Sequence, residues 1–160
     1  MTGSRARRGR RRPTSSVVAA ACVAVLAAGG LAGCADQKQK YCDAVSAHQQ
    51  ELSDLVGSGG SDALLRALGP FRDLRSKAPG DITDEWQQVI TSVEGLQQAL
   101  EAAGVDPATY DRTHPPAGLS AADRARIDAA AKQLGGGTTL RALQDLDQEA
   151  RDVCKTPLTL

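Results

Sequence analysis

The chain has 160 residues, which is the usual length of one domain, and its 19 basic and 19 acidic residues leave no net charge. Six of the 19 basic residues, all arginines, lie in residues 1–33, where there is no acidic residue. Residues 34–160 therefore carry 13 basic and 19 acidic groups, a net charge of about −6. This charge argues against nucleic-acid binding and against electrostatic docking on anionic lipid, because both require a positive surface.

Residues 1–34 have the layout of an export signal. An arginine-rich start is followed by an uncharged, alanine- and glycine-rich run from Ser15 to Gly33. Arginines are costly to move across a membrane, so this end is expected to stay inside the cell. If the run were not cleaved, it could act as a marginal single membrane anchor of about 19 residues.

The end of the apolar run carries a specific motif. Leu31-Ala32-Gly33-Cys34 is followed at once by polar residues, and it resembles the lipobox of bacterial lipoprotein precursors. The resemblance implies a diacylglyceryl group on the Cys34 sulfur and cleavage after Gly33, with residues 1–33 as the signal peptide and 34–40 as a short tether. It also implies an exported protein held on the outer face of the cytoplasmic membrane. The alternative is an ordinary export signal with a coincidental cysteine.

Two further segments are similar to parts of small uncharacterised lipoproteins of high-GC Gram-positive bacteria. These are KYCDAVSAHQQELSDLV near the start of the mature chain and EARDVCKTPL near its end. This resemblance does not indicate any particular biochemical activity. The export route, general or twin-arginine, stays open, because RRRPTSS lacks the apolar residues expected after a twin-arginine pair.

The lipobox resemblance bears on how the four cysteines pair. Cys22 would be removed with the signal, and the sulfur of Cys34 would be a thioether. Cys42 and Cys154 then remain, and only one disulfide is possible. An exported location favours that disulfide. Two free thiols are the alternative, whereas a metal site would need further ligands.

The mature chain shows helical periodicity throughout. A first helix is predicted over 39–56, with one apolar stripe that includes His48. A second is predicted from Ser61, as its N-cap, to about residue 78, kinked or divided at Gly69-Pro70. A third should start at an Asp81 or Thr83 cap and end near residues 103–104. Its apolar stripe comprises Trp86, Val89, Ile90, Val93, Leu96 and Leu100.

After a long loop over 105–119, Ser120 is predicted to cap a fourth helix, with Asp123 in the capping-box position. The glycines 135–137 should end it, and a fifth helix is predicted over 139–154. The pattern predicts an all-α fold, a small disulfide-stapled bundle of four to five helices over residues 41–160. A disulfide from the first helix to the last requires an even number of crossings. With five helices, either one lies across the bundle or the 105–119 loop runs back along it, and we expect the loop to be the return path.

Candidate functional residues are few. Tyr110, Asp111, Arg112 and His114 lie in the long loop, which could recognise a partner or simply cover the bundle. His48 is interpreted as a hydrogen-bonded residue at the core boundary. Asp145, Glu149 and Asp152 share one face of the last helix and could bind Ca²⁺, although surface ion pairing explains them more simply.

No catalytic motif is present in the sequence, and no cofactor or metal is expected apart from the lipid on Cys34. The sequence therefore indicates a non-catalytic, membrane-anchored binding lipoprotein of the cell envelope. Its partners would be the membrane, through the lipid, and an envelope protein or the cell wall. The alternative is a carrier of a small hydrophobic ligand, lipid or haem, in the bundle core; an enzyme is a third hypothesis. A pocket of several hundred Å³ in the core would favour the carrier.

Overall fold

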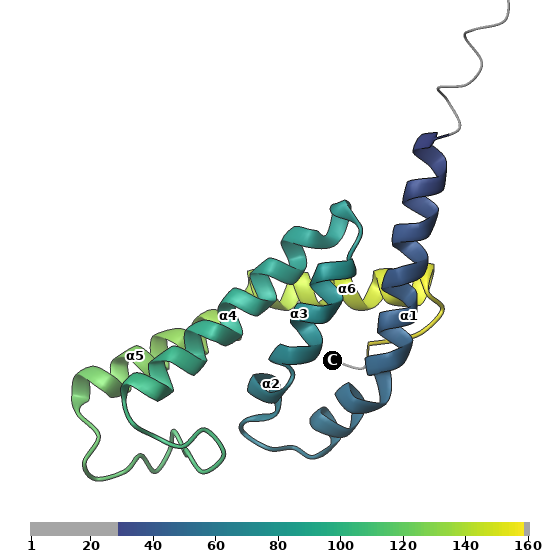
Figure 1. The fold of residues 1–160 in the computed structure, drawn as a ribbon. Helices are drawn as coiled ribbons and strands as arrows, with labels where there is room; N and C mark the ends of the chain where they lie inside the picture. Colours follow the sequence, from purple (N-terminus) through teal and green to yellow (C-terminus); the bar gives the residue numbers. More distant parts are fainter. Residues whose placement is uncertain (1–28, 159–160) are drawn as a thin grey trace, which may run out of the picture.

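The computed structural model describes residues 29–158, and within this range the fold is all-helical (Figure 1). The elements are α1 (Gly29–Gly57), α2 (Ala63–Arg66), α3 (Leu68–Lys77), the 3₁₀ turn η1 (Gly80–Ile82), α4 (Thr83–Ala102), α5 (Ala121–Leu134) and α6 (Gly137–Val153). The predicted all-α fold class is confirmed. The signal-peptide prediction falls mostly on residues 1–28, which lie outside the described range.

Helix α1 begins earlier than predicted. Residues 34–40, expected to be a short tether, are helical. The Gln37 Nε2 donates hydrogen bonds to the carbonyl oxygens of Lys77 at 2.9 Å and Ala78 at 3.3 Å, where α3 ends. At about 1.5 Å per helical residue, the path from residue 34 to residue 42 is about 12 Å, not the roughly 25 Å of an extended chain. The tether is therefore helical and well below the upper limit for an extended chain.

The second predicted helix is divided, as expected, into α2 and α3. Pro70 lies in the first turn of α3, where a missing N–H costs no intrahelical bond. Ser61, however, does not cap α2; its Oγ instead donates to the carbonyl oxygen of Pro107 at 2.8 Å. The cap prediction is wrong because the Ser61 hydroxyl bonds to a carbonyl group that is distant in the sequence.

Helix α4 also starts without the predicted cap. Neither Asp81 nor Thr83 accepts a capping bond, because the 3₁₀ turn η1 leads directly into the helix and Thr83 Oγ1 donates to the carbonyl oxygen of Pro79 at 3.0 Å. The end is as predicted. Gly104 adopts φ +64°, and the N–H of Val105 donates to the carbonyl oxygen of Leu100 at 3.2 Å, which is a glycine-based helix stop.

Helices α5 and α6 together form the return path along α4. Figure 1 shows α5 beside the C-terminal half of α4, and Thr139 at the start of α6 is bonded to Ser92 in the middle of α4. Residues 103–120 stay at one end of the molecule, so the prediction that this loop runs back along the bundle is wrong. The number of crossings is even, because the break at residues 135–136 divides one return crossing into the two helices α5 and α6.

The predicted cap of α5 is confirmed. Ser120 Oγ accepts a hydrogen bond from the N–H of Asp123 at 3.0 Å, and the same hydroxyl donates to the Asp123 carboxylate at 2.6 Å. Helix α5 packs on α4 around the buried side chains of Leu100 and Ile127, which lie outside the main core cluster. Because the loop runs from the end of α4 to the start of α5, the packing of these two helices holds both of its ends.

The main core lies between α1, α3, α4 and α6. Trp86, the only tryptophan, is fully buried; its ring centroid lies 5.6 Å from that of Phe71, and its Nε1 donates to the Tyr41 hydroxyl at 3.2 Å. Burial raises the pKa of Tyr41 to about 12, so the phenol stays neutral near pH 7. Bonding across the core therefore links α1 to α4.

Candidate functional site

The disulfide end of the molecule joins the start of the chain to its finish. Cys42 in α1 and Cys154 after α6 form a disulfide, with their Cα atoms 5.0 Å apart and 112 positions apart in the sequence. The predicted pair is confirmed. Beyond it the chain folds back, and Leu158 is fully buried in the core, with its N–H bonded to Asp147 Oδ1 at 3.1 Å.

Cys34, the predicted lipidation site, lies on α1 two turns before Cys42. Its side chain is outside the part of the chain whose side chains are described. In Figure 1 the N-terminal turns of α1 project beyond the other helices. None of the helices in the described residues is both long enough and apolar enough to cross a membrane.

The long loop lies at the opposite end of the molecule from the N-terminal turns of α1 (Figure 1). One side is held by Ser61, and the other by an ion pair between Arg112 Nε and Asp128 Oδ1 at 3.0 Å. The Ser61 bond also places the turn over 57–61 beside the region after Gly104. The loop is therefore bonded to the turn over 57–61 on one side and to α5 on the other.

The loop also contains a local hydrogen-bond network. The Asp111 carboxylate accepts from the N–H and Oγ1 of Thr113, both at 2.7 Å, and lies 2.9 Å from His114 Nδ1. These bonds, those from Thr113 first, lower the pKa of Asp111 to about 2. The His114 side chain remains 85% exposed. Three of the four predicted loop residues, Asp111, Arg112 and His114, are thus held in place and exposed.

Tyr110 differs from its neighbours in the loop. It is half-buried, and its hydroxyl oxygen is shielded from solvent without a hydrogen-bond partner among the described residues. Tyr110 therefore contributes to the packing of the loop and is less accessible to a partner than its neighbours. Arg112 is a cation held in place at this end by its ion pair with Asp128.

His48 is at the core boundary, as interpreted from the sequence. Its Nδ1 lies 3.2 Å from Glu51 Oε2 and its Nε2 lies 2.9 Å from Asp73 Oδ2, so it bridges α1 and α3. Lys77, and after it His48, lowers the pKa of Asp73 by hydrogen bonding to its carboxylate. Both ring nitrogens are thus occupied by structural contacts.

The acidic residues of α6 do not gather into a metal site. No group of three or more potential metal ligands occurs within the described residues. Burial, followed by repulsion from Asp81, raises the pKa of Glu149. Arg141 donates to the carbonyl oxygen of Gly137, and Asp147 and Arg151, four residues apart on α6, form an ion pair at 2.6 Å.

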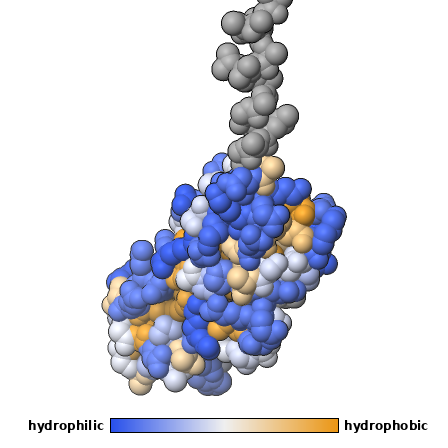
Figure 2. Space-filling view, turned by 45° about the vertical axis from the view of Figure 1, so that its right-hand side comes forward, coloured by the Kyte–Doolittle hydropathy of each residue, from blue (hydrophilic) through white to orange (hydrophobic). Residues whose placement is uncertain are grey.

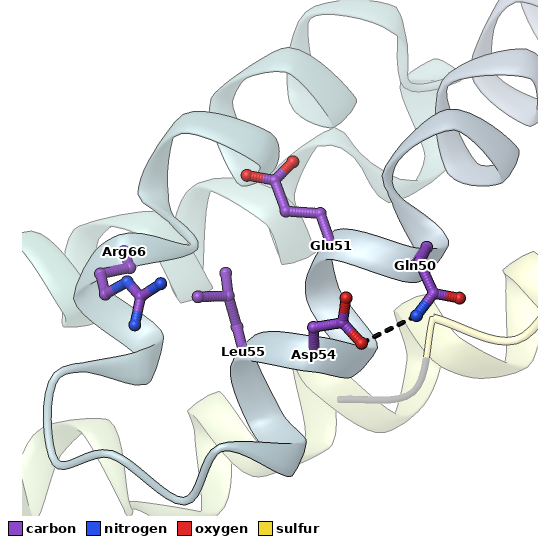
Figure 3. Close-up of a pocket in the computed structure, with 5 residues that line it drawn as sticks. All are labelled: Gln50, Glu51, Asp54, Leu55 and Arg66. Atoms are coloured by element: carbon purple, nitrogen blue, oxygen red, sulfur yellow. Dashed lines mark hydrogen bonds between the residues drawn. The ribbon is translucent and has the colours of Figure 1, made fainter.

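A surface groove between α1 and α2 was missed by the sequence reading (Figure 3). Its volume is about 480 Å³, and its lining residues are Gln50, Glu51, Asp54, Leu55 and Arg66. Four of these five residues are polar or charged, which is not the apolar lining expected for a lipid or haem carrier. The sequence signal is weak, because Arg66 comes from a four-residue helix whose orientation only the fold determines.

The face of the molecule drawn in Figure 2 is mostly hydrophilic, and its apolar areas are separate patches. Among the described residues, Val56 and Leu140 are the large apolar side chains with the greatest exposure, 45% and 48%. Isolated exposed side chains of this kind are normal on a monomer surface. Comparison of the chain with protein-family models, with curated proteins and with solved structures found no match.

Proposed function

We propose that this chain is a non-catalytic binding lipoprotein of the bacterial cell envelope, held on the outer face of the cytoplasmic membrane by a diacylglyceryl group on Cys34. The observation that carries the proposal is the position of this cysteine. It ends the apolar run in the Leu31-Ala32-Gly33-Cys34 motif, and a disulfide-bonded domain follows directly. Disulfides persist in exported proteins, which supports a location outside the cytoplasm.

The pairing of the other cysteines supports the same proposal. Cys42 and Cys154 bond to each other, which leaves Cys34 outside the disulfide framework of the mature chain. Two acyl chains give stable anchoring, since each buried CH₂ contributes about 0.8 kcal/mol and a single chain is marginal. Anchoring therefore needs no membrane-spanning helix.

The geometry of α1 gives the proposed lipoprotein an orientation. With residues 34–40 helical and Gln37 bonded to the end of α3, the domain would sit close to the membrane with its disulfide end inward. The long loop and the turn over 57–61 would then face the wall or a partner protein. Binding at this outer end is the proposed molecular role.

The proposal is tested by producing the full chain in a high-GC Gram-positive host and measuring the intact mass of the membrane-bound product. The expected mass is that of a diacylated chain beginning at Cys34. The matched control is Cys34→Ala, which should carry no lipid and should keep residues 1–33, because the lipobox resemblance ties cleavage after Gly33 to the lipidated cysteine. A wild-type product that is soluble and unlipidated would contradict the proposal.

A further inference from the structure

The groove between α1 and α2 holds opposite charges that do not neutralise each other. Glu51 and Asp54 come from α1 and Arg66 comes from α2, and all three line one hollow. Arg66 makes no ion pair or side-chain hydrogen bond with any other residue in the described range. Figure 3 shows the Leu55 side chain lying between Arg66 and Asp54.

The carboxylates of Glu51 and Asp54 can each accept further hydrogen bonds. Glu51 uses Oε2 toward His48, and Asp54 uses Oδ1 to accept from Gln50 at 2.7 Å. The second oxygen of each carboxylate has no side-chain partner among the described residues. Two carboxylates and one guanidinium thus surround a hollow of about 480 Å³ that is open to solvent.

We infer that this groove is a binding site for a diamino acid, a small molecule that carries two ammonium groups and one carboxylate. The ligand carboxylate would accept two parallel hydrogen bonds from Arg66, whose planar guanidinium suits that geometry. The two ammonium groups would donate to the free oxygens of Glu51 and Asp54. The ligand's aliphatic chain would lie over Leu55, which is only 6% exposed and forms the apolar floor.

The two carboxylates and one guanidinium of the groove favour a diamino acid over ligands with fewer charged groups. A diamine satisfies the carboxylates but leaves Arg66 unpaired, and a neutral amino acid leaves one carboxylate unpaired. The inference does not depend on lipidation of Cys34, because all the groove residues lie in the folded domain. Failure of the anchoring proposal would therefore leave it standing, and its own failure would not affect the anchor.

The test is titration of the full chain, in detergent, with L-lysine as the probe, followed by the backbone amide NMR signals of residues 50–55 and 66. Saturable shifts confined to these residues are expected. Nε-acetyl-L-lysine lacks one ammonium group, and cadaverine lacks the carboxylate. Each should bind about tenfold more weakly, the usual effect of losing one charge-assisted hydrogen bond.

Substitutions identify the groups involved. Arg66→Gln should weaken lysine binding about tenfold while leaving cadaverine binding nearly unchanged, and Asp54→Asn should weaken both. The matched control is Arg124→Gln on α5, an exposed arginine outside the groove. Trp86 fluorescence would show that each variant is folded. Shifts absent from the groove residues, equal binding of lysine and cadaverine, or an equal effect of Arg124→Gln would overturn the inference.

Discussion

Removal of the disulfide should lower the stability of the domain by several kcal/mol. The bond closes a loop over a sequence separation of 112 residues. In the chain-entropy model, a loop of that length restricts the unfolded chain by an amount equivalent to about 5 kcal/mol at 25 °C. This is an upper value, because strain in the native state subtracts from it. Domains of this size are stable by only about 5–15 kcal/mol, so the loss is a large part of the total.

The appropriate variant is the double substitution Cys42→Ser and Cys154→Ser, which leaves no new thiol to react. Urea unfolding can be followed by the fluorescence of Trp86, which is fully buried beside Phe71. With a slope of about 1–3 kcal/mol per molar urea, a loss of up to about 5 kcal/mol lowers the unfolding midpoint by up to about 2–5 M. A midpoint within a few tenths of a molar of the wild type would refute the reasoning, because the two chain ends would then be held together without the bond.

Three further predictions concern single side chains. Tyr41→Phe should lower the free energy of unfolding by about 1–3 kcal/mol, because it leaves the buried Nε1 of Trp86 without its acceptor; an unchanged urea midpoint would be inconsistent with that bond. Ser120→Ala should cost about 1 kcal/mol and increase amide hydrogen exchange in the first turn of α5, whereas the exposed Ser46→Ala should change neither. Asp73→Asn should flatten the loss of stability in acid: the folded pKa of Asp73 is depressed, so its contribution is present above the unfolded value of about 3.8 and lost as the pH falls below it. An unchanged acid slope in urea titrations from pH 5 to pH 2 would count against this role.

Much of the fold followed from apolar periodicity. The residues at helical spacing around Trp86, Val89 and Val93 are buried as expected, and the glycine stop of α4 lies where its sequence placed it. The Ser120 cap was predictable for a similar reason, since its partner Asp123 is three residues away. Such local interactions are visible in a single sequence because both partners are neighbours.

The errors arose from contacts between residues distant in sequence. Ser61 bonds to Pro107 instead of capping α2, and α1 starts earlier than predicted, with Gln37 bonded to the end of α3. The groove around Arg66 could not be found from the sequence either, because its two walls meet only after the chain has turned through residues 57–62. Pattern analysis does not specify which remote carbonyl or helix face a polar side chain will meet.

The central claim is that Cys34 carries the lipid anchor while Cys42 and Cys154 form the disulfide. It is tested most directly by non-reducing tryptic mapping of the protein isolated from membranes. We predict that the peptide of residues 34–38 begins at Cys34 and carries a diacylglyceryl group. The same digest should contain residues 41–66 linked to residues 152–155 through the Cys42–Cys154 disulfide. An unmodified Cys34, or a Cys34 found in a disulfide with either of the other two cysteines, would contradict the account.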